Sequence, residues 1–172
     1  GTMKIGPPTD VESFSGPLIS AAAREAFEAT LAAWAAAGLS FPVEGGTGSL
    51  APSLRRRGQA FVAPALALTE DDLPPELALP EEVEGPLLLA RLVDSAEQAA
   101  GLYNRHPYGL AASVFTESKA RFQGLARLLR AGSVNWNRGT IVASARYPNA
   151  GLRRSGFGAE GNAELIRQST WP

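Results

Sequence analysis

Apolar and amphipathic stretches alternate regularly in the second half of the chain, and this alternation constrains the fold more than any other feature. Residues 86–93 and 110–116 are mostly apolar, and each run is followed by a stretch with helical periodicity, over 95–104 and 117–131. A short predicted strand over 133–136 completes the series. Because parallel strands need long crossover connections, strands and helices in this order favour parallel pairing. We therefore predict an α/β fold with a mostly parallel sheet flanked by helices.

The first half of the chain begins with a predicted amphipathic helix over residues 20–37. Apolar side chains recur at helical spacing on one side, and charged side chains lie on the other. The apolar set is Ala23, Phe27, Leu31 and Trp34, and the charged set is Arg24, Glu25 and Glu28. Ser20 is placed to cap the first turn, and Gly38 can adopt the left-handed conformation common after a helix end.

Between this helix and the alternating region, the pattern predicts two loops and a strand. Residues 45–58 are rich in glycine and serine, so we expect an exposed excursion. Its triplet Arg55 to Arg57 is most simply a solvated loop edge, with an anion site as the alternative. Residues 60–68 predict a strand, in which Pro64 favours an edge or a strand end. Residues 69–80 combine acidic residues with prolines, which is typical of a surface loop.

Capping signals and buried faces are predicted for both helices of the alternating region. Asp94, with Glu97 three residues later, has the spacing of a capping box. The second helix is expected to end at Gly132. The side chains expected to be buried are Ala96, Ala99, Ala100 and Tyr103 in the first helix and Phe122, Leu125, Ala126 and Leu129 in the second. We interpret Trp136 and Trp171 as packing residues.

Length and charge exclude several classes of protein. The 172 residues suffice for one domain with a single core. The net charge of −1 provides no long-range field for nucleic acid or anionic lipid, and the apolar runs are too short to cross a bilayer. We therefore expect no nucleic-acid and no membrane partner. Residues 1–3 resemble a cloning remnant with a start methionine and no export signal follows, so we expect a cytoplasmic protein with a single domain over residues 4–172.

The chain contains no cysteine and a single histidine, His106. Disulfides and thiolate metal sites are therefore excluded. A zinc site would need carboxylates for nearly every ligand, so we expect no metal. His106 lies in a turn-like setting before Pro107, and we interpret it as a loop residue at the start of a strand rather than a base. A serine triad is not expected, because no G-x-S-x-G segment is present.

Residues 156–161 match the spacing G-x-G-x-x-G. A dinucleotide-binding loop of this type needs a preceding strand, a following helix and an acidic residue about twenty positions later. The sequence ends before that position, and Arg153 and Arg154 do not suit a buried parallel strand. We expect no dinucleotide loop here. Downstream, residues 159–165 predict a helical turn, and residues 166–172 could pair as a strand with another element or another subunit.

Three carboxylates, Glu81, Glu82 and Glu84, precede Gly85 and Pro86. Paired carboxylates can supply a general acid and a general base. The alternative is that like charges on one face of an extended segment are simply solvated. Composition favours the solvated interpretation.

Five segments, in order, resemble the carboxy-terminal part of the aldehyde dehydrogenase superfamily. Residues 82–86 read E-V-E-G-P where that family has E-[IV]-F-G-P, and residues 104–116 read N-R-H-P-Y-G-L-A-A-S-V-F-T where it has N-x-T-x-Y-G-L-x-A-x-V-F-T. Residues 148–160 resemble its P-F-G-G-x-K-x-S-G-x-G-x-E. Residues 3–20 resemble the stretch after the nucleophile, and residues 58–64 resemble a strand that opens G-x-F-V-x-P.

This resemblance implies a partial aldehyde dehydrogenase catalytic-domain fold without the NAD-binding domain. The family oxidises aldehydes through a cysteine thiohemiacetal, with NAD or NADP accepting hydride and a glutamate activating water. Both residues lie upstream of the segments matched here, so no catalytic residue is predicted. Residues 132–138, reading G-S-V-N-W-N-R, are most similar to succinylglutamate semialdehyde dehydrogenases.

One inherited cofactor position remains, and two motifs depart from the family. Glu82 matches the glutamate that hydrogen-bonds the nicotinamide ribose, but we expect this position to be vestigial. Glu84 replaces a phenylalanine beside the nicotinamide, where an unpaired carboxylate would cost several kcal/mol to desolvate. Residues 148–151 read P-N-A-G in place of P-F-G-G. We therefore predict a succinylglutamate semialdehyde dehydrogenase-related chain that is truncated and non-catalytic and binds no cofactor alone.

The sequence is compatible with two kinds of protein partner. One is a second copy of the chain, and the other is an aldehyde dehydrogenase-like chain. In the second case, the present chain would be an interaction subunit or the complementing half of a split NAD(P)-dependent enzyme. A further alternative is a small-ligand module that reuses the old substrate pocket.

Overall fold

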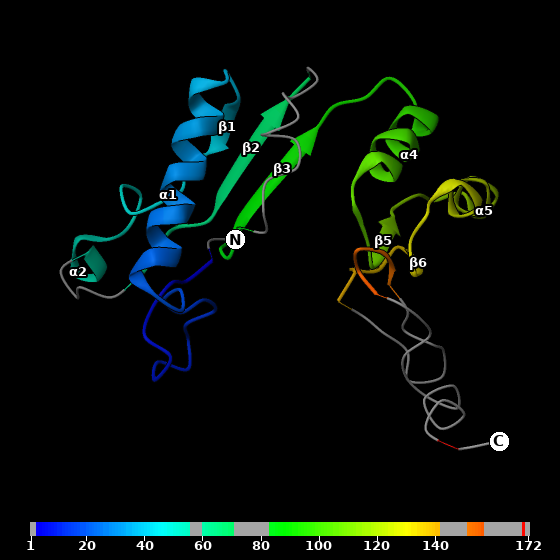
Figure 1. The fold of residues 1–172 in the computed structure, drawn as a ribbon. Helices are drawn as coiled ribbons and strands as arrows, with labels where there is room; N and C mark the ends of the chain where they lie inside the picture. Colours follow the sequence, from blue (N-terminus) through cyan, green and yellow to red (C-terminus); the bar gives the residue numbers. More distant parts are fainter. Residues whose placement is uncertain (1–2, 56–59, 71–82, 142–150, 157–169, 171–172) are drawn as a thin grey trace. The chain divides into compact units, whose positions relative to one another are not determined.

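The computed structural model describes residues 3–55, 60–70, 83–141, 151–156 and 170. These residues belong to two compact units, Gly1–Leu92 and Val93–Pro172 (Figure 1). No helix within the described ranges is long and apolar enough to cross a bilayer. The predicted turn at 159–165 lies outside the described residues, and so does the tail at 166–172 apart from Thr170.

Three strands form one sheet in the first unit, in the order β1, β2, β3. Their bounds are Ser40–Val43, Ala65–Thr69 and Leu87–Arg91. β1 pairs antiparallel with β2, whereas β2 and β3 run parallel in continuous register, with Ala65 opposite Leu87 at one end of the ladder. The longest ladder of this unit is therefore parallel, as predicted.

Helix α1, Ala21–Ala36, covers one face of this sheet (Figure 1). Phe27 and Trp34 are buried and pack on Ala65 and Ala67 of β2. Ser20 caps the helix, since its Oγ accepts the Ala23 N–H at 3.0 Å, and Gly38 after the helix has φ +86°. Both capping predictions and the buried positions of Phe27 and Trp34 are confirmed. The cap contact is local in sequence, whereas helical periodicity predicted which face of the helix would meet the distant sheet.

Glu28 does not lie on the solvent side of α1 as predicted. It is half-buried, and its Oε1 accepts the Thr47 N–H at 2.6 Å. The loop after β1 folds back onto the helix there, and Gly46 has φ +79°. Glu28 is thus drawn from solvent by a hydrogen bond to a loop. Helical periodicity describes only the helix and could not predict this contact.

The excursion over residues 45–58 is anchored by a small core of its own. Leu50 is buried with Phe61 and Ala63, and the single-turn helix α2, Pro52–Arg55, follows it. Arg55 is exposed, and its guanidinium donates to the carbonyls of Leu50 and Gly48, both at 2.9 Å. Its bonds therefore stabilise the loop. The other two arginines of the triplet lie outside the described residues.

The strand predicted over residues 60–68 begins later than expected, at Ala65. Residues 60–63 are buried but form only an isolated bridge between Ala63 and Gly46. Pro64 explains the boundary, because it has no N–H to donate to a ladder. It lies directly before the first residue of a central strand, so the prediction of a strand end at Pro64 is confirmed.

A β-α-β unit forms the centre of the second unit. β5, Ala111–Val114, leads through α5, Lys119–Leu128, to β6, Ser133–Trp136, and the two strands pair in parallel. α4, Ala96–Arg105, precedes it, and a short antiparallel pair joins β4, Tyr108–Gly109, to β7, Leu152–Arg153. The predicted strand at 133–136 is confirmed residue for residue.

The capping box of α4 lies one residue later than predicted. Ser95, not Asp94, is the N-cap, and its Oγ accepts the Gln98 N–H at 3.1 Å. Gln98 returns a bond, because its Oε1 accepts the Asp94 N–H at 2.8 Å. Adjacent residues that can both cap leave the start of a helix undetermined by sequence spacing.

Fewer residues of α4 and α5 are buried than predicted. In α4, Ala100 is buried, Ala96 and Tyr103 are half-buried, and Ala99 is exposed. In α5, the four residues expected to be buried are all half-buried, and the helix ends at Leu128 rather than at Gly132. Within the described ranges, these helices lie over a pair of four-residue strands, which is too small a layer to bury a full helical face.

Candidate functional site

The inherited cofactor position, Glu82, lies outside the described residues, and so does Glu81. Glu84 is described and exposed, which agrees with the solvated interpretation for this carboxylate. Gly85 follows it against the core, where a Cβ would overlap the ring of Phe27. Glycine is therefore required at this position, where the segment before β3 packs against α1.

The segment of Gly85 and Pro86 also forms part of a pocket in the first unit. Its volume is about 360 Å³. The lining residues are Met3, Val43, Pro64, Ala65, Leu66, Gly85, Pro86, Leu87 and Leu88. None of these side chains carries a charge or a hydroxyl. The pocket can therefore accept an apolar group, but its lining offers no nucleophile and no general acid or base.

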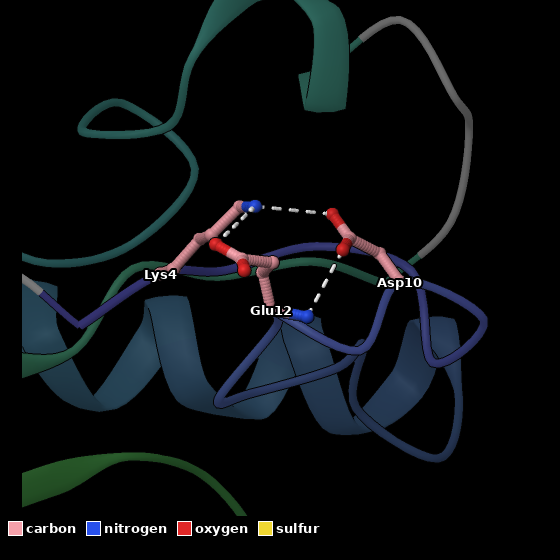
Figure 2. A network of polar contacts seen from close by, with 3 residues as sticks. All are labelled: Lys4, Asp10 and Glu12. Atoms are coloured by element: carbon pink, nitrogen blue, oxygen red, sulfur yellow. Dashed lines mark hydrogen bonds and ion pairs between the residues drawn. The ribbon is translucent and has the colours of Figure 1, made fainter.

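A network of charged side chains fixes the first loop of the chain (Figure 2). Lys4 Nζ lies 3.3 Å from Asp10 and 3.8 Å from Glu12, and the Glu12 N–H donates to Asp10 at 3.0 Å. The bond from the Glu12 N–H, followed by that from Lys4, lowers the pKa of Asp10 from its usual 3.8. The three side chains are exposed and satisfy one another, so we assign them a structural role.

In the second unit, the guanidinium of Arg153 joins three backbone segments. It donates to the carbonyls of Asn104 and Tyr108 at 2.6 Å and of Arg130 at 3.0 Å. It also lies over the ring of Tyr103, 5.6 Å from its centroid. Burial raises the pKa of Tyr103, and the nearby positive charge of Arg153 partly opposes that rise. The sequence interpretation considered Arg153 only as unsuited to a strand and missed this contact.

Asn104 completes the same junction. Its Nδ2 donates to the Leu128 carbonyl at 2.7 Å, and its Oδ1 accepts the Arg130 N–H at 2.8 Å. One amide therefore satisfies the carbonyl of the last residue of α5 and an N–H just beyond it, where helical hydrogen bonds are no longer available. No role was predicted for Asn104 from the sequence. Its position as the first residue of the family-like segment 104–116 was the signal that could have identified it.

Asn137 has a similar role at the end of β6. Its backbone has φ +50°, and its side chain accepts the Thr116 N–H at 2.8 Å and donates to the Thr116 carbonyl at 3.0 Å. Trp136 donates from Nε1 to the same carbonyl at 2.8 Å and stacks on Phe122. The packing interpretation of Trp136 is confirmed, whereas Trp171 lies outside the described residues.

His106 lies at the carboxyl end of α4, just before β4. Its Nδ1 accepts the Tyr108 N–H at 3.3 Å. The interpretation of His106 as a loop residue at the start of a strand is confirmed. Among the described residues, no group of three or more His, Cys, Asp or Glu side chains is placed to hold a metal ion.

The described residues do not form a cradle for a dinucleotide. Gly156 follows β7, which has two residues and pairs antiparallel with β4. A Rossmann-type loop instead connects a parallel strand to a helix whose N-terminus faces the phosphates. The rest of the segment 156–161 lies outside the described residues. The described part of this segment therefore lacks the strand arrangement of a Rossmann-type loop.

The chain was compared with known sequences. It matches the aldehyde dehydrogenase family over residues 1–171. It is 34% identical, over 95% of its length, to the 2-hydroxymuconic semialdehyde dehydrogenase of Pseudomonas putida. It is 37% identical, over 84% of its length, to the N-succinylglutamate 5-semialdehyde dehydrogenase of Caulobacter sp.. These matches cover 33% and 27% of the two relatives, so the chain spans about a third of their length.

Solved structures give the same result. The betaine aldehyde dehydrogenase of Staphylococcus aureus, in complex with NAD+, has a TM-score of 0.81 at 27% identity. The indole-3-acetaldehyde dehydrogenase of P. syringae has a TM-score of 0.83 at 30% identity. The two alignments cover 96% and 98% of this chain and 32% of each enzyme. The fold prediction is confirmed, and the chain belongs to the aldehyde dehydrogenase family.

Proposed function

We propose that this chain is a succinylglutamate semialdehyde dehydrogenase-related protein that does not oxidise aldehydes alone. The observation that carries this proposal is the absence of cysteine from all 172 residues. Aldehyde oxidation of the kind implied by the family resemblance begins with attack of a cysteine thiolate on the aldehyde carbon. A chain without a thiol cannot make that bond.

A hydroxyl group is a poor substitute for the missing thiolate. A serine or threonine needs a general base within hydrogen-bond reach, because its hydroxyl is un-ionised and weakly nucleophilic at neutral pH. The single histidine already accepts a bond from the Tyr108 N–H. The apolar pocket offers no base among its lining residues. These contacts support the proposal that the chain alone lacks catalytic activity.

The substrate class of the parent activity is the second part of the proposal. The segment G-S-V-N-W-N-R at 132–138 suggests a semialdehyde derived from an acylated amino acid. The similarity to an N-succinylglutamate 5-semialdehyde dehydrogenase supports this assignment. Enzymes named for 2-hydroxymuconic semialdehyde and succinate semialdehyde are also similar, at 34% and 32% identity. The semialdehyde class is thus shared among several relatives, and the succinylated substrate is our more specific proposal.

Cofactor and location complete the proposal. We propose that the chain alone binds neither NAD nor NADP, with Glu82 as a vestigial position. The antiparallel setting of β7 and the exposure of Glu84 support this view. We also propose a cytoplasmic location, which fractionation of the source cells would test.

The test is an NAD(P)-linked assay of the purified chain with succinylglutamate semialdehyde, succinate semialdehyde and betaine aldehyde. The full-length Caulobacter relative serves as the positive control. We expect no reduction of NAD or NADP above the enzyme-free rate, and no shift of the melting temperature with either dinucleotide. Turnover by the pure chain with any of these substrates would refute the proposal.

A second candidate function is favoured by the exposed apolar face of the first unit. In this alternative, the chain complements an aldehyde dehydrogenase segment that carries the thiol and the dinucleotide site. Leu88 is 63% exposed and Val43 is 48% exposed on this face. Activity that returns only when the two polypeptides are produced together would support this function, and self-association without any gain in activity would contradict it.

A further inference from the structure

Residues 151–156 of the second unit are held by polar contacts to distant parts of the chain, and we call this segment the latch. Its strand, β7, pairs with β4. The guanidinium of Arg153 donates to three backbone carbonyls, those of Asn104, Tyr108 and Arg130. One side chain of the latch thus joins the chain around the carboxyl ends of α4 and α5.

Two further hydrogen bonds fasten the latch to the segment that follows α4. Ser155 Oγ accepts the Gly109 N–H at 3.0 Å, and the Arg154 N–H donates to the Pro107 carbonyl at 3.1 Å. The partners of these side chains lie between 23 and 49 positions earlier in the chain. Because every partner belongs to another segment, the contacts all depend on the position of the latch as a whole.

The latch contributes little apolar burial to the second unit. Leu152 is its one large apolar side chain, and this side chain is 42% exposed. The β5–β6 pair, in contrast, contains the buried Ala112 and is covered by the stack of Trp136 on Phe122 of α5. Segments with few apolar contacts open at a lower free energy than the packed core does. The latch can therefore separate without exposing the packed face of the β5–β6 pair.

Two features of Arg153 oppose closure of the latch. Its backbone has φ +59°, in the left-handed region that is unfavourable for residues with a Cβ. Its Nε is buried without a hydrogen-bond partner among the described residues. In an open latch, the backbone can relax and Nε can bind water. The closed position is therefore maintained by the polar contacts and lost when they are weakened.

Gly109 is the residue on which the latch closes. A Cβ at this position would lie 2.8 Å from both the Arg130 carbonyl oxygen and Nη2 of Arg153. Any larger residue would displace the guanidinium or the carbonyl that it binds. The same glycine donates its N–H to Ser155, so the side chains of two latch residues meet at one backbone position.

We propose that the latch opens and closes as one unit while the β5–β6 pair stays folded. In the open state, the three carbonyls, the Gly109 N–H and the Arg153 guanidinium reach water together. The latch is thus a conformational device of the second unit. It needs neither a thiol nor a dinucleotide, so it is independent of the proposed function.

Amide hydrogen exchange of the 172-residue chain, followed by NMR, tests this proposal. The reporters are the N–H groups of Gly109 and Arg154, which bond across the latch in opposite directions. The references are the most protected amides of the β5–β6 ladder. We expect the two reporters to share one protection factor to within about threefold, at least about tenfold below the references.

Two substitutions test whether the contacts break together. Ser155→Ala removes the acceptor of the Gly109 N–H, yet it should also lower the protection of the Arg154 N–H about fivefold, although the Pro107 carbonyl is unchanged. Arg153→Lys keeps the charge but loses the planar fork that bridges three carbonyls. It should lower the protection of both reporters by the same factor, at least about tenfold.

Arg154→Met is the matched control, because it changes an exposed side chain of the same latch. It should alter the protection of the Gly109 N–H by less than about twofold. Circular dichroism checks the fold of each variant, and if Arg153→Lys does not fold, Ser155→Ala still decides between the outcomes.

Three results would overturn the inference. The first is a difference of more than about threefold between the two reporters, which would mean separate openings. The second is equal protection of reporters and references, which would mean that the latch opens only when the whole unit unfolds. The third is an effect of Ser155→Ala confined to the Gly109 N–H, which would mean that the contacts break one by one.

Discussion

At the residue scale, the family-like motifs that the structure describes hold backbone segments together. Arg153 and Asn104 satisfy carbonyl and amide groups around the ends of α4 and α5. Asn137 does the same for Thr116, from a left-handed backbone conformation that asparagine tolerates better than most residues. These residues stabilise the second unit through contacts that require no nucleophile, so the segment can fold like the family without a cysteine.

Replacing Arg153 should destabilise the chain more than replacing its neighbour. Arg153→Met removes donors from three carbonyls, and since bonds to charged groups are worth about 1.5–3 kcal/mol each and are not additive, we expect a loss of about 3 kcal/mol. Urea denaturation followed by circular dichroism measures it.

Arg154, which is exposed, provides the matched control for this measurement. Arg154→Met should change the free energy of unfolding by less than about 0.5 kcal/mol. Equal losses in the two variants would mean that general charge, and not the three carbonyl contacts, accounts for the effect.

At the scale of elements, the sequence predicted α1 and β6 with their ends, but it misplaced the cap of α4 and the end of α5. Residues such as Phe27 and Trp34 repeat at helical spacing, and this pattern depends only on neighbours in the chain. The position of a helix end depends on which of several residues that can cap the helix forms the hydrogen bond to a backbone N–H. Asp94 and Ser95 both can cap α4, and the structure uses Ser95.

The cap of α4 can therefore be tested by two neighbouring substitutions. Ser95→Ala removes the acceptor for the Gln98 N–H and should cost about 1 kcal/mol of unfolding free energy. Asp94→Ala should cost less than about 0.5 kcal/mol, because Asp94 takes part through its backbone N–H.

Thermal or urea unfolding of the two variants, measured at the same pH, checks this order. If Asp94→Ala proved the more damaging change, the capping box predicted from spacing would be correct and the observed cap would be wrong.

At the scale of the whole molecule, the chain combines the family framework with a sequence that contains no cysteine. It aligns with nearly all of its own length on enzymes three times as long, and it contains no thiol. If the complementation alternative holds, the thiol that reacts must come from the partner polypeptide.

The two polypeptides can be alkylated separately before they are mixed. Only alkylation of the partner should reduce the restored activity. Treating the partner with iodoacetamide should abolish NAD(P) reduction, because alkylation consumes its thiolate. Treating the present chain should leave the rate within about twofold of the untreated mixture, since no cysteine is available to react. An assay after removal of the reagent checks both arms, and inactivation through the present chain would show that another of its groups takes part in the chemistry.

The sequence alone determined helices α1, α4 and α5, strand β6, the preference for parallel pairing, the family and the lack of a thiol, because each depends on residue type and short-range spacing. Tertiary structure alone decided that Glu28 binds a loop, that Arg153 reaches a carbonyl 49 residues away, and that one sheet face lacks a layer among the described residues. Those features depend on which distant groups meet in space. Spacing along the chain carries no information about such partners.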